Sequence, residues 1–372
     1  MRFETKAIHT GLDIGNPSSS IVPPISPSTI FEIDKQGRKS GDLHYTRLDN
    51  PNRSQFETLI ASLEGGEVAA AFSSGIAAAT AILQSLEPGD HLLIPDDVYA
   101  GNRKMVNSIM IRWGLDVDFI KMTDPEEVKK HIKPETKIIW VETPSNPLMQ
   151  VTDIRTTATI AEKNDIRLVV DNTWPTPVNQ RPLEHGADLV LHSTSKYFGG
   201  HSDLLGGAVV SKESDSFFEQ IRLTQQMGGA VPSPQDCWML SRSTRTLAYR
   251  MKGHNEHALE VARFLEGHPK VDKVYYPGLE SHPQHDIAKG QMHGFGGMIS
   301  FFLNGTLEES IAVVGRSHLI KRATSLGGVE STWEHRGSSE GQGSVSPDNL
   351  IRMSVGLEHP EDLKEDLERA LG

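Results

Sequence analysis

Lys196 is the residue best suited to covalent chemistry. It lies in LVLHSTSKYFGGHSD (residues 189–203), where an apolar run ends in hydroxyl residues and a lysine, followed by two glycines. An amine at the end of a buried strand is partly desolvated, which lowers its pKa and favours the uncharged form. An uncharged amine is what an aldehyde cofactor needs to form an imine. The alternative interpretation is a solvated surface lysine.

Two other segments place candidate cofactor contacts after apolar runs. Asp171 closes the run LVVD, and a buried carboxylate needs a partner, such as the protonated ring nitrogen of a pyridine cofactor. The alternative is that Asp171 caps the next helix. AFSSGIAAA (residues 71–79) turns through Gly75 into a helical pattern, and the N–H groups at such a helix start bind phosphate.

Three more segments carry candidate side chains. Tyr99 follows the run HLLIP and is placed to stack on a flat ring, or to pack as an ordinary aromatic. ETPSNP (residues 142–147) ends another apolar run with polar groups. Arg352 lies in NLIRMSVGLE and suits bidentate binding of a substrate carboxylate, with an ion pair between domains as the alternative.

Elements that position these residues can be predicted from the pattern. Short apolar runs (VAAAF, HLLIP, KIIWVE, RLVVDN, ADLVLHS, GGAVV) alternate with helical stretches, which predicts an α/β fold with a mostly parallel central sheet. In such a sheet the chemistry sits at the carboxyl ends of the strands. We expect an extended N-terminal arm (1–50), a large domain (51–235) and a smaller C-terminal α+β domain (236–372).

Composition excludes several classes of protein. The 372 residues carry a net charge of −12, which argues against nucleic-acid binding. No apolar run approaches 18 residues and no secretory signal is visible, so we expect no membrane partner. The single cysteine, Cys237, is typical of a reducing cytoplasm. His282 and His285 lack a third metal ligand and are interpreted as structural; no metal site is expected.

The ordered set of motifs resembles a known family. HYTRLDNPNR, SSGIAA, DDVY, ETPSNP, VDNT, HSTSKYFGGHSD, VPSPQDCW, YPGL, SHPQH, SLGGVES and LIRMSVGLE are similar, in chain order, to the landmarks of the Cys/Met-metabolism (trans-sulfuration) enzymes, which depend on pyridoxal 5′-phosphate (PLP). The resemblance runs nearly the full chain. It implies PLP fold type I, the aspartate-aminotransferase-like fold, and a homo-oligomer built as a dimer of dimers.

The resemblance also implies roles for individual residues. Lys196 and Tyr99 would be the catalytic residues, Lys196 holding PLP as a Schiff base and Tyr99 stacking on its ring. The cofactor site would comprise Lys196, Asp171, Ser74, Gly75, Ile76, Tyr99, Ser193 and Ser195, with Tyr45 and Arg47 lent by a neighbouring subunit. Asn146, Ser325 and Arg352 would bind the substrate carboxylate, and Glu330 the far end of the substrate.

The implied reaction is γ-elimination or γ-replacement on a homoserine-derived amino acid, as in cystathionine γ-lyase and γ-synthase. The alternatives are cystathionine β-lyase, O-acyl-homoserine sulfhydrylase or methionine γ-lyase activity, or a PLP-fold protein without turnover. Three departures concern the substrate. His44 replaces a commonly acidic residue, Ala100-Gly101 follows Tyr99 where methionine γ-lyases have a cysteine, and the segment 331–348 is short and contains EHR instead of Pro-Ala-x-Met-Thr-His.

Overall fold

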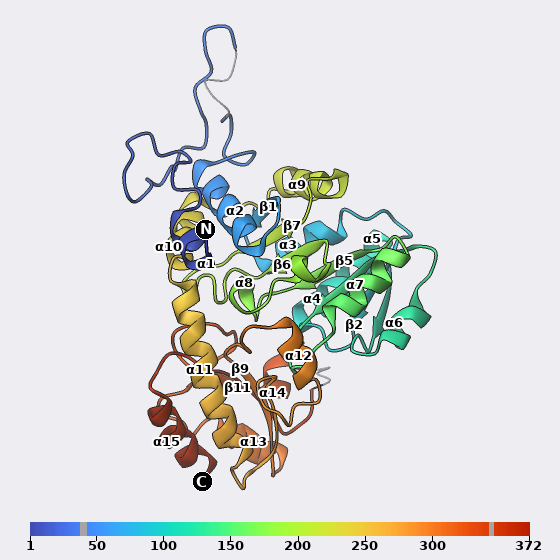
Figure 1. The fold of residues 1–372 in the computed structure, drawn as a ribbon, viewed down its shortest axis with the longest axis vertical. Helices are drawn as coiled ribbons and strands as arrows, with labels where there is room; N and C mark the ends of the chain where they lie inside the picture. The colour runs from blue at the N-terminus through green and yellow to red at the C-terminus, as the bar shows by residue number, and fades with distance from the viewer. Residues whose placement is uncertain (38–42, 342–345) are drawn as a thin grey trace.

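Two β-sheets organise the chain. The computed structural model describes residues 1–37, 43–341 and 346–372. The remaining parts of the predicted arm and of the short segment, 38–42 and 342–345, lie outside the described residues. The first sheet has seven strands in the order β1-β7-β6-β5-β4-β2-β3, and the second has five in the order β10-β11-β12-β9-β8 (Figure 1).

The seven-stranded sheet is parallel except for β7, which is antiparallel to both of its neighbours. Its strands are β1 (Val68–Phe72), β2 (His91–Pro95), β3 (Asp116–Ile120), β4 (Thr136–Glu142), β5 (Arg167–Asp171), β6 (Leu189–His192) and β7 (Gly207–Ser211). Alternate residues of each strand enter two separate apolar cores, so that Val170 belongs to one core and Val169 to the other. Because both faces are buried, the polar residues that follow the strands emerge at the sheet's edge.

Helices cover both faces of this sheet. One core takes apolar side chains from α2 (Pro51–Glu64), α7 (Ile154–Lys163) and α10 (Pro234–Thr244). The other takes them from α3 (Gly75–Leu83), α4 (Ala100–Met105), the π-helix η1 (Val106–Met110) and α9 (Ser216–Gly228). Shorter helical segments are α5 (Ile111–Trp113), α6 (Pro125–His131), α8 (Thr176–Asn179) and the 3₁₀ turn η2 (Pro182–His185).

The second sheet forms a separate core with two helices. Its strands are β8 (Val271–Tyr275), β9 (Met298–Leu303), β10 (Lys321–Arg322), β11 (Thr332–His335) and β12 (Leu350–Ser354). Their apolar residues pack with α11 (Leu247–Glu266) and α15 (Pro360–Leu371). The other helices of this region are α12 (His285–Gln291), α13 (Leu307–Val313) and α14 (Arg336–Glu340). Figure 1 shows α11 running from the large sheet's end of the molecule toward the C-terminus.

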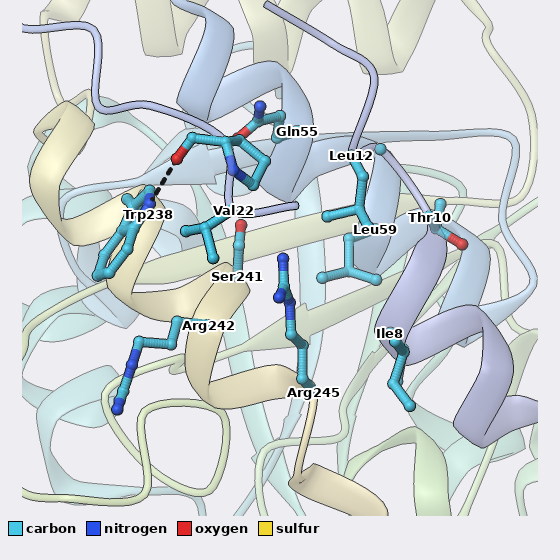
Figure 2. A pocket seen from close by; sticks show the side chains of 13 residues that line it. Ile8, Thr10, Leu12, Val22, Gln55, Leu59, Trp238, Ser241, Arg242 and Arg245 are labelled. Atoms are coloured by element: carbon cyan, nitrogen blue, oxygen red, sulfur yellow. Dashed lines mark hydrogen bonds between the residues drawn. The ribbon is translucent and has the colours of Figure 1, made fainter. Parts of the chain in front are cut away.

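The N-terminal segment is held on the large domain by a few contacts. It begins with a short helix, α1 (Phe3–His9), whose Ala7 is buried against α2. Trp238 of α10 donates its indole N–H to the carbonyl of Pro23 at 2.9 Å. Trp238 lines a cavity of about 210 Å³ (Figure 2). Several apolar side chains of the segment are exposed, including Ile21 (87%) and Ile30 (69%). This segment therefore leaves apolar surface uncovered in the single chain.

The predicted fold class is confirmed: the chain is α/β with a mostly parallel central sheet and a second sheet. All six apolar runs quoted above form strands. Two details differ from the sequence interpretation. The arm contains α1, and strand β3 was missed because Asp116 and Asp118 interrupt its apolar residues.

Within the described residues, no helix is both long and apolar enough to span a membrane. The same residues contain no cluster of three or more histidine, cysteine, aspartate or glutamate side chains that could hold a metal ion. His282 and His285 instead contact the carbonyls of Met149 and Pro277, at 3.1 and 2.8 Å.

Gly207 sets the distance between β7 and the turn that starts α3. A Cβ at this position would lie 2.2 Å from the carbonyl oxygen of Ser74, so Gly207→Ala must displace that turn. We expect the substitution to cost roughly 1–3 kcal/mol of stability, seen as a lower thermal midpoint. Gly290→Ala in α12 is the matched control, because a Cβ there meets nothing within 4 Å. Equal midpoints for the two variants would contradict this packing.

Candidate active site

A cavity of about 480 Å³ opens at the carboxyl ends of β4, β5 and β6. Most of the residues that the sequence singled out line it: Ser74, Gly75, Ile76, Tyr99, Asn146, Asp171, Ser193, Ser195, Lys196, Ser325 and Arg352. Ser325 and Arg352 come from the region of the five-stranded sheet and the others from the region of the seven-stranded sheet. Residues more than 250 positions apart in the chain therefore share one site.

Lys196 carries a perturbed amine in this cavity. Its Nζ donates a hydrogen bond to the hydroxyl of Ser325, at 2.6 Å. Burial lowers the pKa of Lys196 to about 8, assisted by the positive charge of Arg352 and opposed by Glu334. Ser325 has φ +83°, a left-handed conformation that is strained for a serine and that is concentrated at functional sites. The amine is thus partly uncharged near neutral pH.

Asp171 ends β5 with one oxygen committed to hydrogen bonds. The backbone N–H and the hydroxyl of Thr173 both donate to Oδ1, at 3.0 and 2.5 Å. Within the described residues Oδ2 accepts no such bond and is available to a ligand. Asp171 does not cap the next helix, because α8 starts at Thr176 with Pro175 as its N-cap residue. Burial raises the pKa of Asp171, and the Thr173 hydrogen bonds partly oppose that rise.

Glu142 is a second carboxyl group beside Asp171. The two residues are paired across β4 and β5, and Glu142 is 6% exposed. Burial, then the charge of Asp171, raises the pKa of Glu142 well above its usual value. Its Oε2 accepts the backbone N–H of Tyr99 at 2.9 Å, which holds the start of α4 against the site. The sequence analysis included Glu142 in the ETPSNP motif and gave it no role.

The start of α3 lies against the end of β6. A Cβ on Gly75 would be 2.7 Å from the Cβ of Ser193, so only glycine allows this approach. Ser74 caps the helix through its hydroxyl, which accepts the N–H of Ala77 at 3.1 Å. The hydroxyl of Ser195 exchanges hydrogen bonds with the backbone of Gly206, at 2.9 and 3.2 Å. The first-turn N–H groups at Gly75 and Ile76 therefore face a ready anion position.

Tyr99 folds back over Gly101. A Cβ on Gly101 would lie 2.4 Å from the Tyr99 ring, so a side chain at this position would displace the ring. Tyr99 is 42% exposed and lines the cavity, which rules out the interpretation as an ordinary core aromatic. The Ala100-Gly101 pair is thus compatible with a tyrosine ring held at the cavity wall.

Arg352 is buried between the two domains. Its Nη1 donates to Oδ1 of Asn146 at 2.8 Å, and its Nη2 contacts the carboxylate of Glu334. Arg352 is 4% exposed, and burial lowers its pKa to about 10. Arg336 and Glu340 of α14 also line the cavity, and no role was predicted for either. The EHR stretch, residues 334–336, was the available signal for Arg336.

Four other residues stay apart from the cavity lining in the part of the chain that the structure describes. Tyr45 is exposed, and Arg47 donates to the carbonyl of Gln226 at 2.7 Å. Glu330 accepts a hydrogen bond from the Ser202 hydroxyl. His44 is exposed on the N-terminal segment. Their predicted roles, which need a second subunit or a bound substrate, stay predictions.

Comparison with known proteins identifies the family. The profile described as "Cys/Met metabolism PLP-dependent enzyme" matches residues 4–372. The chain belongs to this family. It is therefore a PLP-dependent enzyme, and the predicted resemblance and cofactor are confirmed.

Proteins of similar sequence are named for different activities. The chain is 42% identical to cystathionine γ-synthase of Mycobacterium leprae over 99% of this chain and 96% of that protein. It is equally similar, at 42%, to cystathionine β-lyase of Coxiella burnetii over 99% and 97%. The crystal structure of cystathionine γ-lyase from Lactobacillus plantarum with L-serine superposes with a TM-score of 0.93 at 38% identity, covering 100% and 98%.

The residues at the cavity fit PLP. At the start of α3, where Gly75 approaches Ser193 closely, the first-turn N–H groups suit a phosphate. The available Oδ2 of Asp171 suits a protonated ring nitrogen, and the desolvated amine of Lys196 suits an aldehyde. Three independent features of the cavity therefore match three different groups of one cofactor.

The pKa of Lys196 leads to a pH prediction. An amine reacts with an aldehyde only when uncharged, so the rate of PLP uptake by the apoenzyme should rise with pH, with a midpoint near pH 8. Arg352→Met removes a positive charge that lowers this pKa, so its midpoint should move to higher pH. Stopped-flow absorbance from pH 6.5 to 10 measures both curves. A midpoint near 10.5, the ordinary value for lysine, would contradict the desolvated amine.

Proposed function

We propose that this enzyme catalyses γ-elimination or γ-replacement on a homoserine-derived amino acid, using PLP bound to Lys196. The observation that carries the proposal is the desolvated Lys196 amine, in one cavity with the carboxylate-binding candidates Arg352 and Asn146. PLP bound at this site withdraws electrons from the bonds at the substrate's α-carbon. The remaining tasks fall to side chains of this chain.

Arg352 binds the α-carboxylate of the substrate. Its guanidinium is buried and already held by Asn146 and Glu334, so the side chain loses little conformational freedom when a carboxylate binds. A charge-assisted, desolvated contact of this kind is strong and directional. With the carboxylate fixed, the α-carbon is presented to the amine of Lys196.

Lys196 moves protons at the substrate. When the Lys196 amine is not bonded to the cofactor, its pKa near 8 would suit both accepting and returning a proton near neutral pH. The Ser325 hydroxyl, at 2.6 Å, holds that amine in position. With PLP bound, Tyr99 would cover the cofactor ring and Asp171 would hold its nitrogen.

Only the far end of the substrate separates γ- from β-chemistry, since both use the same cofactor site. The relatives' names include γ-synthase, γ-lyase and β-lyase. Glu330 supports a substrate with a cationic or hydrogen-bond-donating far end. His44 removes the acidic residue that commonly assists it, which favours a γ-substituent other than that of cystathionine. O-acyl-homoserine sulfhydrylase and methionine γ-lyase activity therefore stay alternatives.

A homo-oligomer built as a dimer of dimers completes the proposal. Tyr45 and Arg47 would reach the phosphate of a neighbouring subunit, which accounts for their separation from the cavity in the single chain. The exposed apolar residues of the N-terminal segment supply surface for that association. Light scattering of the purified protein measures the assembly. A cytoplasmic location also stays a prediction.

Product identity tests the proposed reaction. Cystathionine and O-acetyl-homoserine should give 2-oxobutanoate and ammonia, or a new thioether when a thiol is supplied. The panel is assayed by mass spectrometry of the oxo acids, with the Arg352→Ala enzyme as control. That variant loses a desolvated contact worth on the order of 2–5 kcal/mol, so its kcat/KM should fall at least about thirtyfold. Pyruvate as the dominant product of cystathionine would contradict γ-chemistry.

A further inference from the structure

Four charged side chains form an alternating chain beside the cavity, and three of them, Arg336, Glu340 and Arg352, line it. Arg352 contacts the Oε1 atom of Glu334, and the same oxygen accepts a hydrogen bond from Arg336 Nη1 at 2.8 Å. Arg336 Nε lies 2.8 Å from Glu340, whose carboxylate also accepts the Ser346 hydroxyl at 2.8 Å. Arg352, Glu334 and Arg336 are only 4, 2 and 5% exposed. The order of charges is therefore positive, negative, positive, negative.

Glu334 has an oxygen that could form a second hydrogen bond to the guanidinium of Arg352. Its second oxygen, Oε2, is buried and has no hydrogen-bond partner among the described residues. A carboxylate with both oxygens turned to a guanidinium forms a bidentate pair and occupies the donors that a substrate carboxylate needs. Arg336 opposes that bidentate pairing, because it binds the same Glu334 oxygen that Arg352 contacts.

We propose that Arg336 is a positioning residue that keeps Arg352 available to the substrate's α-carboxylate by sharing the charge of Glu334. The inference rests on the proposed role of Arg352. With both arginines present, Glu334 shares its negative charge between them, so Arg352 keeps positive charge that attracts a carboxylate. Without Arg336, a buried Glu334 neutralises Arg352 and competes with the substrate for it.

Two small probes isolate the carboxylate contact on the holoenzyme. L-Norvaline has the α-amine and α-carboxylate of the substrates and no γ leaving group. n-Butylamine is the same molecule without the carboxylate. Calorimetry should show Arg336→Gln weakening norvaline binding by about tenfold or more, as expected when a buried counter-charge is removed, with butylamine unchanged. Arg336→Lys, which keeps the charge, should lose much less.

The double variant Glu334→Gln/Arg336→Gln decides the mechanism. Removing the competing carboxylate should restore norvaline affinity to within a few-fold of the wild type, although two buried groups have been changed. Arg167→Gln, which removes another ion-paired arginine outside the cavity, serves as the control and should match the wild type.

Two results would overturn the proposal. A double variant as weak as Arg336→Gln would mean that Arg336 binds the carboxylate itself. Equal weakening of norvaline and butylamine would mean that Arg336 only maintains the fold. The proposed function fails differently: a wild-type enzyme that binds norvaline no better than butylamine has no carboxylate contact at all, and the role of Arg336 falls with it.

Discussion

An amine that loses its proton near neutral pH needs surroundings poor in water, and much of the large domain provides them around Lys196. Strand β6 is buried on both faces and ends at His192, four residues before Lys196, so the lysine follows directly from the core. Arg352 adds a positive charge from the other domain. The state of the amine therefore depends on both domains being in contact, with Ser325 as the direct link.

The same edge of the sheet brings two buried carboxyl groups close together, and their ionised forms repel each other. Glu142 and Asp171 end adjacent strands, and burial raises the pKa of each. Thr173 and the N–H of Tyr99 offset part of that cost through hydrogen bonds. The proposed cationic ring nitrogen at Asp171 would offset more of it, since an opposite charge favours the ionised carboxylate. Cofactor binding and the stability of this edge are accordingly coupled, because a ligand that binds only the folded state stabilises it.

The parts predicted from sequence are those that depend on local pattern. A strand buried on both faces is a continuous apolar run, and the polar residue that ends it must lie at the sheet's edge, which is why Lys196 and Asp171 could be located. Strand β3 was missed because acidic residues break that pattern. Glu334 and Arg336 were missed because charged residues are normally exposed, and their burial arises only when β11, α14 and β12 pack together. Tyr45 and Arg47 depend on a second copy of the chain, which no local pattern describes.

The central claim is that the desolvated amine at the end of β6 is the one that carries PLP. Borohydride reduction of the holoenzyme, followed by digestion and peptide mass spectrometry, locates the cofactor directly, since reduction fixes it to the lysine that holds it. The account predicts a phosphopyridoxyl group on the peptide containing Lys196, and none on any peptide of a Lys196→Ala enzyme treated in parallel. The same modification on a different lysine, or an unmodified Lys196 peptide from fully loaded enzyme, would contradict it.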